Sequence, residues 1–384
     1  MKRYVGLLSA VVVLLFAIGT SWAAEPIKIG YIAALTGSAS GWGQSEFGGA
    51  SLFVKEINER GGVLGRPIEL ICYDTKGRAD EAVLAVRRMI FEDKVVAIGG
   101  SNFSSIQLAI APIMDQNKIP SVASSATNPA VTVDPDTGKV RPYMFRIAFT
   151  DPYQGKVIAD YLIQRQGAKK IAVFSDVGSP YSEGLTEFFK ARATELGIEH
   201  KGWGFREGDV DFRALITEAR SWGADAIALT SLYTEMGLII KQAAELGWKP
   251  YFMGGDGLNP AIYEIAGADN MEGTFWVQTM SYTDPKVVEL DDRHLAAFGS
   301  RATSPSNQVL AYDIMWFITD AIARAGSADP TAIRDAMEAT ENLQVTHFTW
   351  TVDRETHNPV NKPGAILTGK DGKLQFVETW APTN

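Results

Sequence analysis

The sequence predicts an α/β protein of two Rossmann-like lobes, each built around a parallel central sheet. Short apolar runs alternate with segments of helical spacing along most of the chain, and such a succession of βα units is typical of a parallel sheet with helices on both faces. The alternation pauses at the turn-rich segment 134–142 and then starts again. The length of 384 residues also suits two domains, since a domain usually holds about 100–200 residues.

The first series of βα units precedes residue 134. Its opening helix carries Phe47, Ala50, Val54 and Ile57 on one face and ends at a pair of glycines, which commonly terminate helices. The strands expected in this series are 27–35, 68–74, 94–100 and 119–125. The helical segments expected after the last three strands are 79–93, 106–117 and 126–132.

The second series begins with segment 143–149, which we interpret as a strand that crosses between the lobes. Four further strands are expected at 169–176, 199–205, 224–231 and 250–256. The helices expected between them are 182–197, 211–223 and 234–247.

A three-strand hinge is expected to join the two lobes. The strand 273–280 would return the chain to the first lobe, where the apolar segment 308–326 predicts a long helix. This division assigns residues 24–146 and 278–349 to lobe 1, and residues 147–277 and 350–384 to lobe 2.

The first 23 residues have the pattern of a secretory signal peptide. Two basic residues precede an apolar stretch, 7–18, and small residues lead to Ala23, after which we expect cleavage. The alternative, an uncleaved membrane anchor, is less favoured because the stretch is shorter than the ~20 residues that span a bilayer. The mature chain is therefore expected in the periplasm.

Composition and motifs exclude several classes of function. With 36 basic and 45 acidic residues, the net charge of −9 does not favour nucleic acids or anionic membranes. Cys72 is the only cysteine, so no intramolecular disulfide can form, and its apolar surroundings predict a buried strand position. The phosphate-cradle, zinc-protease and nucleophile-elbow motifs do not occur, and the four histidines lack metal-ligand spacing. We expect no enzyme activity, no cofactor and no metal.

Polar loops follow the strands of the first series. The ligand of an open α/β sheet lies outside the carboxyl ends of the strands, so these loops are expected to line one cleft. Helix N-termini favour anions, and Ser104, Ser125 and Thr127 would donate hydrogen bonds to the same oxygens. A ligand carboxylate fits this description. The alternative is that these residues are ordinary helix caps and turn formers.

The loops of the second series offer the opposite polarity. Asp256 follows an apolar strand in a glycine-rich turn and is a candidate partner for an ammonium group. Tyr181 and Tyr233 would supply hydrogen bonds and apolar walls. The alternative is that Asp256 only shapes its turn. Glu235, near the same mouth, is expected to act as a carboxylate in the first turn of its helix.

Seven stretches of the sequence, in their order and spacing, resemble the periplasmic branched-chain amino-acid-binding proteins. They are IGYIAALTGSASGWGQSEFGGASLFVKEINERGGVLGRPIEL, SSATNP, DVGSPYSEGL, LYTEMG, FMGGDG, THNPVNKPGAI and KDGK. The resemblance covers essentially all of the mature chain. It implies the type I periplasmic binding fold, a Venus flytrap of two lobes, and the role of substrate-binding component of an ABC importer.

The resemblance also implies roles for individual residues. The family places an aromatic residue at the cleft in the loop after its first strand, and that position falls here on Trp42. The stretch that binds the carboxylate and amino groups of the ligand falls on Ser125 and Thr127. The two aromatic hydroxyls and the acid that receives the ammonium fall on Tyr181, Tyr233 and Asp256.

The sequence departs from this family at positions that bear on the ligand. Phe103, with Ser104 next to it, stands where the family carries a serine that binds the carboxylate. Gln308 stands where an apolar wall is expected. The disulfide of the family lacks its cysteines, because Gly77 and Asn102 occupy the matching positions.

We expect a monomeric, extracytoplasmic protein that captures a small branched-chain, hydrophobic or aromatic amino acid between its lobes. It would deliver this ligand to the permease and ATPase of an ABC transporter. The departures leave aromatic carboxylates, urea and short amides open as alternative ligands, and a sensory protein of the same fold is an alternative role. Asp256 favours a ligand with a cationic group, since an unpaired buried carboxylate costs a few kcal/mol.

Overall fold

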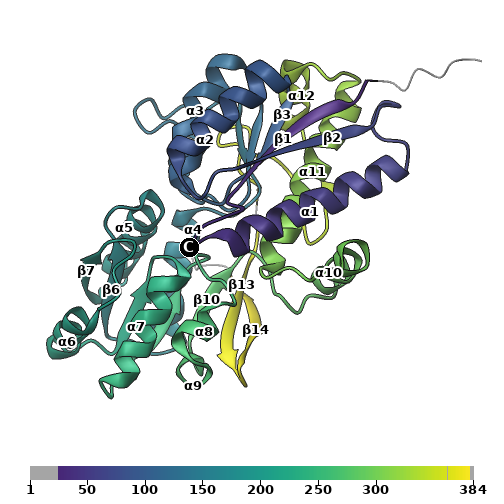
Figure 1. The fold of residues 1–384 in the computed structure, drawn as a ribbon. Helices are drawn as coiled ribbons and strands as arrows, with labels where there is room; N and C mark the ends of the chain where they lie inside the picture. Colours follow the sequence, from purple (N-terminus) through teal and green to yellow (C-terminus); the bar gives the residue numbers. More distant parts are fainter. Residues whose placement is uncertain (1–24, 361, 381–384) are drawn as a thin grey trace, which may run out of the picture.

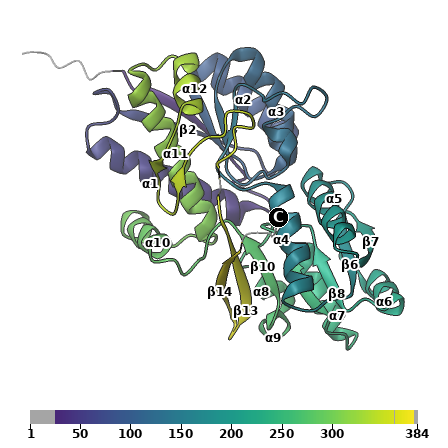
Figure 2. The ribbon, with the colours of Figure 1, turned by 180° about the vertical axis from the view of Figure 1, so that it is seen from behind.

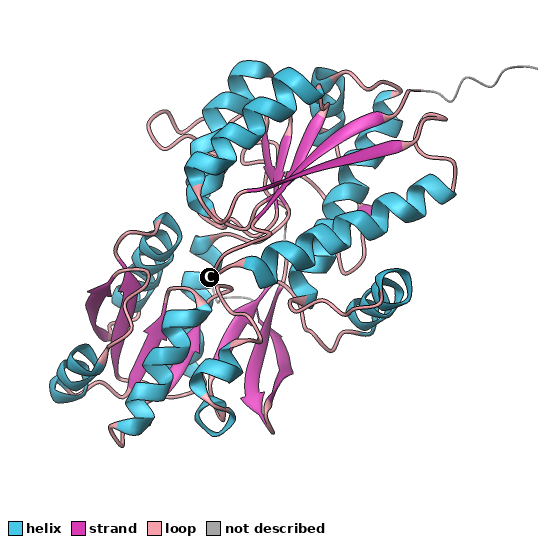
Figure 3. Cartoon of the chain, in the orientation of Figure 1, coloured by secondary structure: helices cyan, strands magenta, loops and turns pink. Residues whose placement is uncertain are grey.

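The computed structural model describes residues 25–360 and 362–380 and confirms the expected α/β fold of two lobes (Figure 1). Each lobe has its own sheet, and helices cover both faces of each sheet (Figure 3). The expected signal peptide, residues 1–23, and its cleavage site after Ala23 lie outside the described residues. No helix among the described residues is long and apolar enough to cross a membrane.

A five-stranded sheet forms the centre of lobe 1. Its order is β2-β1-β3-β4-β5, and all neighbouring strands are parallel. The strands are β1 (Ile27–Ala33), β2 (Ile68–Asp74), β3 (Ala97–Gly100), β4 (Ser121–Ala123) and β5 (Met144–Arg146). Their side chains are mostly apolar because a parallel sheet is covered on both faces. Cys72 lies in β2 as expected, although it is half-buried instead of fully buried, and burial raises the pKa of its thiol to about 12.

A seven-stranded sheet forms the centre of lobe 2, with the order β14-β13-β10-β9-β8-β6-β7. Its parallel strands are β6 (Lys170–Asp176), β7 (Glu199–Phe205), β8 (Ala226–Leu229), β9 (Tyr251–Gly254) and β10 (Phe275–Gln278). An antiparallel hairpin, β13 (Gly364–Lys370) and β14 (Lys373–Trp380), extends this sheet beside β10 (Figure 2). Its turn places Asp371 and Gly372 at positive φ, as a two-residue hairpin turn requires.

The helices follow the strands in the expected alternation. Those that pack on lobe 1 are α1 (Ser40–Glu59), α2 (Ala79–Arg88), α3 (Ser104–Asn117), α10 (Pro285–Phe298), α11 (Pro305–Ala325) and α12 (Pro330–Glu338). Those of lobe 2 are α4 (Asp151–Gln164), α5 (Pro180–Glu195), α6 (Arg213–Trp222), α7 (Tyr233–Glu245), α8 (Ile262–Ala266) and α9 (Ala268–Met271). A π-helical turn, Met89–Asp93, continues α2.

Segment 126–132 was expected to be helical, but it forms only the single 3-10 turn Pro129–Val131. The buried guanidinium of Arg146 donates hydrogen bonds to the carbonyl oxygens of Ala126 and Asn128, at 2.7 and 2.9 Å. The Ala126 carbonyl is therefore engaged by a side chain instead of by a helix, and the Asn128 carbonyl also accepts from the backbone N–H of Val131 within the 3-10 turn. The strand expected over 143–149 is correspondingly short, since β5 ends at Arg146.

The chain passes between the two lobes three times: after β5, after β10, and between β12 (Thr349–Trp350) and β13. Trp350 and Val352 pack in the core that contains β1 and α11. The ring of His357 stacks on Phe145 of β5 with its centroid 4.1 Å away. The assignment of residues 350–384 to lobe 2 stays a prediction. Together with the hydrogen bonds from Arg146 to Asn358 and from Val360 to Thr351, these contacts favour a later boundary, after Val360.

Helices α1 and α11 pack side by side against the sheet of lobe 1, and the N-terminal end of α1 reaches the cleft (Figure 1). They approach closely at Gly49, where a Cβ atom would lie only 2.0 Å from the backbone oxygen of Gln308. This contact fixes the position of α1, whose first turns carry Trp42. The packing of two helices at one glycine therefore helps to place a side chain of the cleft.

We expect Gly49→Ala to lower the free energy of unfolding by about 3 kcal/mol, because the backbones of α1 and α11 must separate to admit a methyl group. Thermal or urea unfolding of the purified variant measures this effect. Gly41→Ala, on the same helix, is the matched control, because its Cβ would meet side-chain atoms and no backbone atom: the hydroxyl of Thr303 at 3.2 Å and the amide nitrogen of Asn259 at 3.6 Å. Equal unfolding midpoints for Gly49→Ala and the unaltered protein would contradict the close contact.

Candidate ligand-binding site

A cavity with an empty volume of about 460 Å³ lies between the lobes, at the carboxyl ends of the strands of both sheets. This is the expected place for a ligand in open α/β sheets. Lobe 1 contributes Trp42, Asn102, Phe103, Ser104, Ser105, Ser125 and Asn307. Lobe 2 contributes Ser179, Tyr181, Leu232, Asp256 and Gly257.

Helix α3 presents its N-terminus to the cavity. Phe103 has extended backbone angles and precedes the first helical residue, Ser104. The side-chain amide of Gln107 donates to the carbonyl oxygen of Gly100 at 2.5 Å, which ties the first turn of the helix to the end of β3. The first backbone N–H groups of a helix have no intrahelical acceptor, so this end favours an anion.

Three aromatic rings form a wall beside that helix end. The ring of Trp42 makes edge contacts with Phe103 and Tyr233, with centroid distances of 6.2 and 5.0 Å. The hydroxyl of Tyr233, from lobe 2, donates to the backbone oxygen of Ser38 in lobe 1 at 3.0 Å. Phe103 also lies against Gly77, where a Cβ would be 3.6 Å from the ring. The wall therefore joins two loops of lobe 1 to lobe 2.

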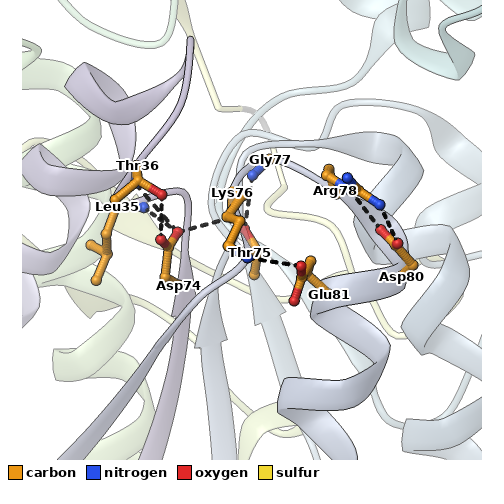
Figure 4. A network of polar contacts seen from close by, with 9 residues as sticks. All are labelled: Leu35, Thr36, Asp74, Thr75, Lys76, Gly77, Arg78, Asp80 and Glu81. Carbon is orange, nitrogen blue, oxygen red and sulfur yellow. Dashed lines mark hydrogen bonds and ion pairs between the residues drawn. The ribbon is translucent and has the colours of Figure 1, made fainter.

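The loop that leads to Trp42 is held by Asp74 at the end of β2 (Figure 4). One carboxylate oxygen of Asp74 accepts from the backbone N–H groups of Leu35 and Lys76 at 2.9 and 2.8 Å, and the other accepts from the hydroxyl of Thr36. Burial opposes ionisation of Asp74, but these hydrogen bonds lower its pKa overall. Sequence reasoning did not identify this anchor, although Asp74 is the last residue of an expected strand.

Asp256 lies across the cavity from α3, at the end of β9. Its backbone N–H donates to the side-chain oxygen of Gln154 at 3.1 Å, and the next N–H, of Gly257, donates to the hydroxyl of Tyr181 at 3.1 Å. One carboxylate oxygen of Asp256 is buried and has no hydrogen-bond partner. Burial raises the pKa of Asp256 to about 7, although hydrogen bonds with Gln154 and Tyr181 oppose the shift.

Glu46 is a buried acid of lobe 1 that sequence reasoning missed. It lies within α1, where a glutamate normally faces solvent, and no local pattern marks it. One oxygen accepts from the hydroxyl of Ser124 and, at 3.3 Å, from the side-chain amide of Asn307. The other oxygen has no partner. Burial raises the pKa of Glu46 to about 7, against the hydrogen bonds that stabilise its ionised form.

The structure brings six of the nine expected site residues together in the cavity wall: Trp42, Phe103, Ser104, Ser125, Tyr181 and Asp256. Thr127, Tyr233 and Gln308 lie outside that lining. Tyr233 stands behind Trp42, and the hydroxyl of Thr127 is buried without a hydrogen-bond partner. Gln308 is fully buried at the contact between α1 and α11, and its side-chain amide has no partner.

The four histidines make contacts within the protein instead of meeting at one site. His200 and His294 contact Thr194 and the backbone oxygen of Ser300, while His347 and His357 contact Asp313 and the backbone oxygen of Met144. No group of three or more histidine, cysteine, aspartate or glutamate residues in the described parts of the chain has the geometry of a metal site.

Two α/β lobes with a polar cavity between them define a solute-binding protein of the bilobal class. The chain belongs to the periplasmic binding protein family, whose sequence model matches residues 26–373. This match confirms the family and the type I fold that the sequence motifs indicated.

Individual relatives agree with this assignment. A leucine-, isoleucine-, valine-, threonine- and alanine-binding protein of Pseudomonas aeruginosa is 31% identical, over 83% of this chain and 84% of its own. The crystal structure of the leucine-binding protein LivK of Thermotoga maritima superposes with a TM-score of 0.84, at 34% identity, and the match covers 93% of this chain and 99% of LivK. The branched-chain amino acid transporter substrate-binding protein LivJ of Streptococcus pneumoniae, solved with isoleucine, also gives a TM-score of 0.84, at 28% identity over 93% and 100% of the two chains.

Glu46→Gln is expected to stabilise the protein at pH 8 and to leave its stability unchanged at pH 4. The folded state raises the pKa of Glu46 from 4.5 to about 7, so ionisation destabilises the fold progressively as pH rises through this window. Removing the charge would raise the free energy of unfolding by up to roughly 3 kcal/mol at pH 8.

Thermal unfolding of Glu46→Gln at both pH values measures this difference. Glu59→Gln is the matched control, because Glu59 lies on the same helix and is exposed in an ion pair with Lys55. A lower unfolding midpoint for Glu46→Gln at pH 8 would show that the ionised carboxylate is required as an acceptor.

Proposed function

We propose that the protein captures a small amino acid with a hydrophobic side chain in the cleft and delivers it to an ABC transporter. The observation that carries this proposal is the opposite polarity of the two lobes across one cavity. Lobe 1 offers the N-terminus of α3 with Ser104 and Ser125, and lobe 2 offers the unpartnered carboxylate oxygen of Asp256. A zwitterion has one charged group for each side.

The surfaces between these two ends suit an apolar side chain. Trp42, Phe103, Tyr181 and Leu232 line the cavity, and apolar and aromatic walls with a few polar groups are typical of small-ligand sites. Relatives at 31% and 34% identity are named for binding leucine, and the structure of LivJ contains isoleucine. Both facts support a branched-chain or similar amino acid as the ligand.

Ligand-driven closure is the expected mechanism. The lobes contact each other at the cleft mouth through the hydrogen bond from Tyr233 to Ser38 and one from the side-chain amide of Asn128 to the backbone oxygen of Pro180, at 3.0 and 2.8 Å. A ligand that also bridges Ser125 and Asp256 adds contacts that only closed lobes provide. Closure follows because the ligand binds the closed form more tightly than the open one.

The proposed role includes a place outside the cytoplasm and specific partners. The signal-peptide pattern of residues 1–23 and the membership of the periplasmic binding protein family support export to the periplasm. The ABC permease and ATPase are the proposed receivers of the ligand, since LivJ is described as a transporter substrate-binding protein. The protein would act as a monomer, by binding and without catalysis.

An aromatic carboxylate is the second candidate ligand, because the ring of Phe103 lines the cavity where the amino-acid binders carry a hydroxyl. A thermal-shift screen separates the two classes, since a ligand that binds only the folded state raises the unfolding midpoint. We expect leucine, isoleucine, valine or phenylalanine to raise it, and benzoate, urea and acetamide to have no effect. A shift confined to benzoate would favour the aromatic carboxylate and remove Asp256 from ligand contact.

Asp256→Asn is expected to weaken amino-acid binding by about 2 kcal/mol or more, roughly 30-fold, because the ammonium loses a desolvated ionic partner. Isothermal titration calorimetry with leucine at pH 8 measures this loss. The exposed residue Asp269 supplies the control variant, Asp269→Asn, which should bind as the unaltered protein does. Unchanged affinity in Asp256→Asn would exclude the proposed ammonium site.

A further inference from the structure

Two carboxyl groups lie together at the base of the cleft. Asp256 lines the cavity, and Asp151, the first residue of α4, is fully buried behind it. Gln154 bridges them, because its amide nitrogen donates to Asp151 at 3.0 Å while its oxygen accepts from the backbone N–H of Asp256 at 3.1 Å. Each carboxyl group keeps one buried oxygen without a hydrogen-bond partner.

Helix α5 leaves room for this arrangement at Gly184. A Cβ atom there would lie 2.9 Å from the unpartnered oxygen of Asp151, so the carboxyl group rests directly against the helix backbone. The backbone N–H of Asp151 donates to the backbone oxygen of Thr127 at 2.9 Å. Asp151 is thus held between the two lobes, next to the loop of lobe 1 that reaches the cavity at Ser125.

Arg146 is the cation that attracts both carboxyl groups. It is fully buried, and its guanidinium donates to Asn358, Ala126, Asn128 and Thr132 at 2.7 to 3.0 Å. All four acceptors are uncharged. One guanidinium therefore offsets one negative charge at a distance, and a second buried negative charge would stay uncompensated.

The other groups that face the pair are polar but uncharged at neutral pH. Thr127 and Gln154 oppose the rise in the pKa of Asp151, and Gln154 and Tyr181 oppose the rise in the pKa of Asp256. The charge of Asp256 raises the pKa of the Tyr282 phenol. Burial raises the pKa of both aspartates to about 7, and each carboxylate raises the pKa of the hydroxyl groups around it further. Two buried carboxyl groups beside a single cation, Arg146, therefore favour a state in which the pair holds one proton when no ligand cation is bound.

We propose that the Asp151–Asp256 pair couples ligand capture to proton release, with the ammonium group of the ligand replacing the proton that the two carboxyl groups hold. The proton passes to solvent, and the bound state then contains two carboxylates balanced by Arg146 and the ammonium. Asp151 acts as a positioning residue, because it acts on the ligand through Asp256. This inference rests on the proposed function, since it requires a ligand with a cationic group.

The coupling gives the affinity a defined dependence on pH. Below pH 7 the ligand must displace a proton, so binding weakens, and above pH 7 the pair is already ionised. For a group that titrates near 7, affinity at pH 6 should be about tenfold lower than at pH 8. Glu46 has the opposite effect on the pH dependence of affinity, because an anion bound by lobe 1 favours its protonated form. The contribution of the Asp151–Asp256 pair is therefore measured with Glu46→Gln, in which Glu46 cannot titrate.

Calorimetry with leucine tests the inference. Titrations at pH 7 in two buffers of different ionisation enthalpy give the number of protons released, for which we expect about half a proton per ligand bound. Dissociation constants at pH 6 and pH 8 should differ about tenfold. The same titrations of Glu46→Gln remove the opposite contribution of Glu46, and no proton release together with equal affinities in that variant would overturn the inference.

The variant Asp151→Asn tests whether the proton release comes from the Asp151–Asp256 pair. The amide keeps the oxygen that accepts from Gln154 and removes one charge, so Asp256 should be ionised beside Arg146. We expect proton release to disappear, and the affinities of the variant at pH 6 and pH 8 to differ by less than about threefold. The control is Asp115→Asn, which changes a half-buried carboxyl group on α3 that accepts from the backbone N–H of Tyr143. It should release protons as the unaltered protein does.

Three outcomes remain distinguishable. Proton release that persists in Asp151→Asn would overturn the assignment to the pair. Leucine binding by Glu46→Gln without proton release would overturn the inference and leave the proposed function in place. Failure of leucine and of all the other amino acids in the screen to bind would overturn the proposed function and this inference with it.

Discussion

Burial of carboxyl groups beside the cleft is the constraint on which the other properties of this site depend. Glu46, Asp151 and Asp256 each keep one buried oxygen without a hydrogen-bond partner. Arg146 attracts the two aspartates, but its own hydrogen bonds go to neutral groups. An incomplete network of this kind is costly in a site of low dielectric. A ligand that brings the missing charge therefore binds more favourably here than its contact area alone would suggest.

The topology explains why these groups meet. Parallel strands point their carboxyl ends to one edge of each sheet, and the two edges face each other across the cavity. Asp256 follows β9 and Ser104 follows β3, while the crossing after β5 carries Arg146 and Asp151 between the lobes. The same crossing thus joins the lobes and carries the buried charges. A movement of the lobes must change the environment of those charges, which is the physical basis for linking closure to ligand charge.

Most of the fold and part of the site could be predicted from the sequence. Buried parallel strands appear in the sequence as continuous apolar runs. The two lobes, and the loops that line the cavity, could therefore be assigned from the sequence. Arg146 and Gln154 gave no comparable signal, because a charged or polar residue in an element normally faces solvent and only tertiary packing buries it. The hairpin β13 and β14 was missed for a related reason: its outer strand is largely exposed and lacks an apolar run.

Side-chain direction in irregular segments also could not be read from the sequence. Ser125 lines the cavity, whereas Thr127, two residues later, lies outside the lining with a buried hydroxyl. The guanidinium of Arg146 binds the carbonyl oxygens of Ala126 and Asn128 and thereby fixes the path of this loop. The decisive interaction comes from a strand that is distant in sequence, so no local pattern contains it.

Phe103 shows how one substitution can alter both the packing and the chemistry of the cleft. Its ring lies against Gly77 and also contacts Trp42. Ring packing therefore connects the loop after β2 to the first turn of α1 and to the start of α3. In the proposed binding mode, Phe103 offers no hydroxyl group to the ligand carboxylate, so Ser104, Ser125 and the N-terminus of α3 would supply the donors. Recognition of the carboxylate would then depend more on backbone N–H groups, and the aromatic wall would select the side chain.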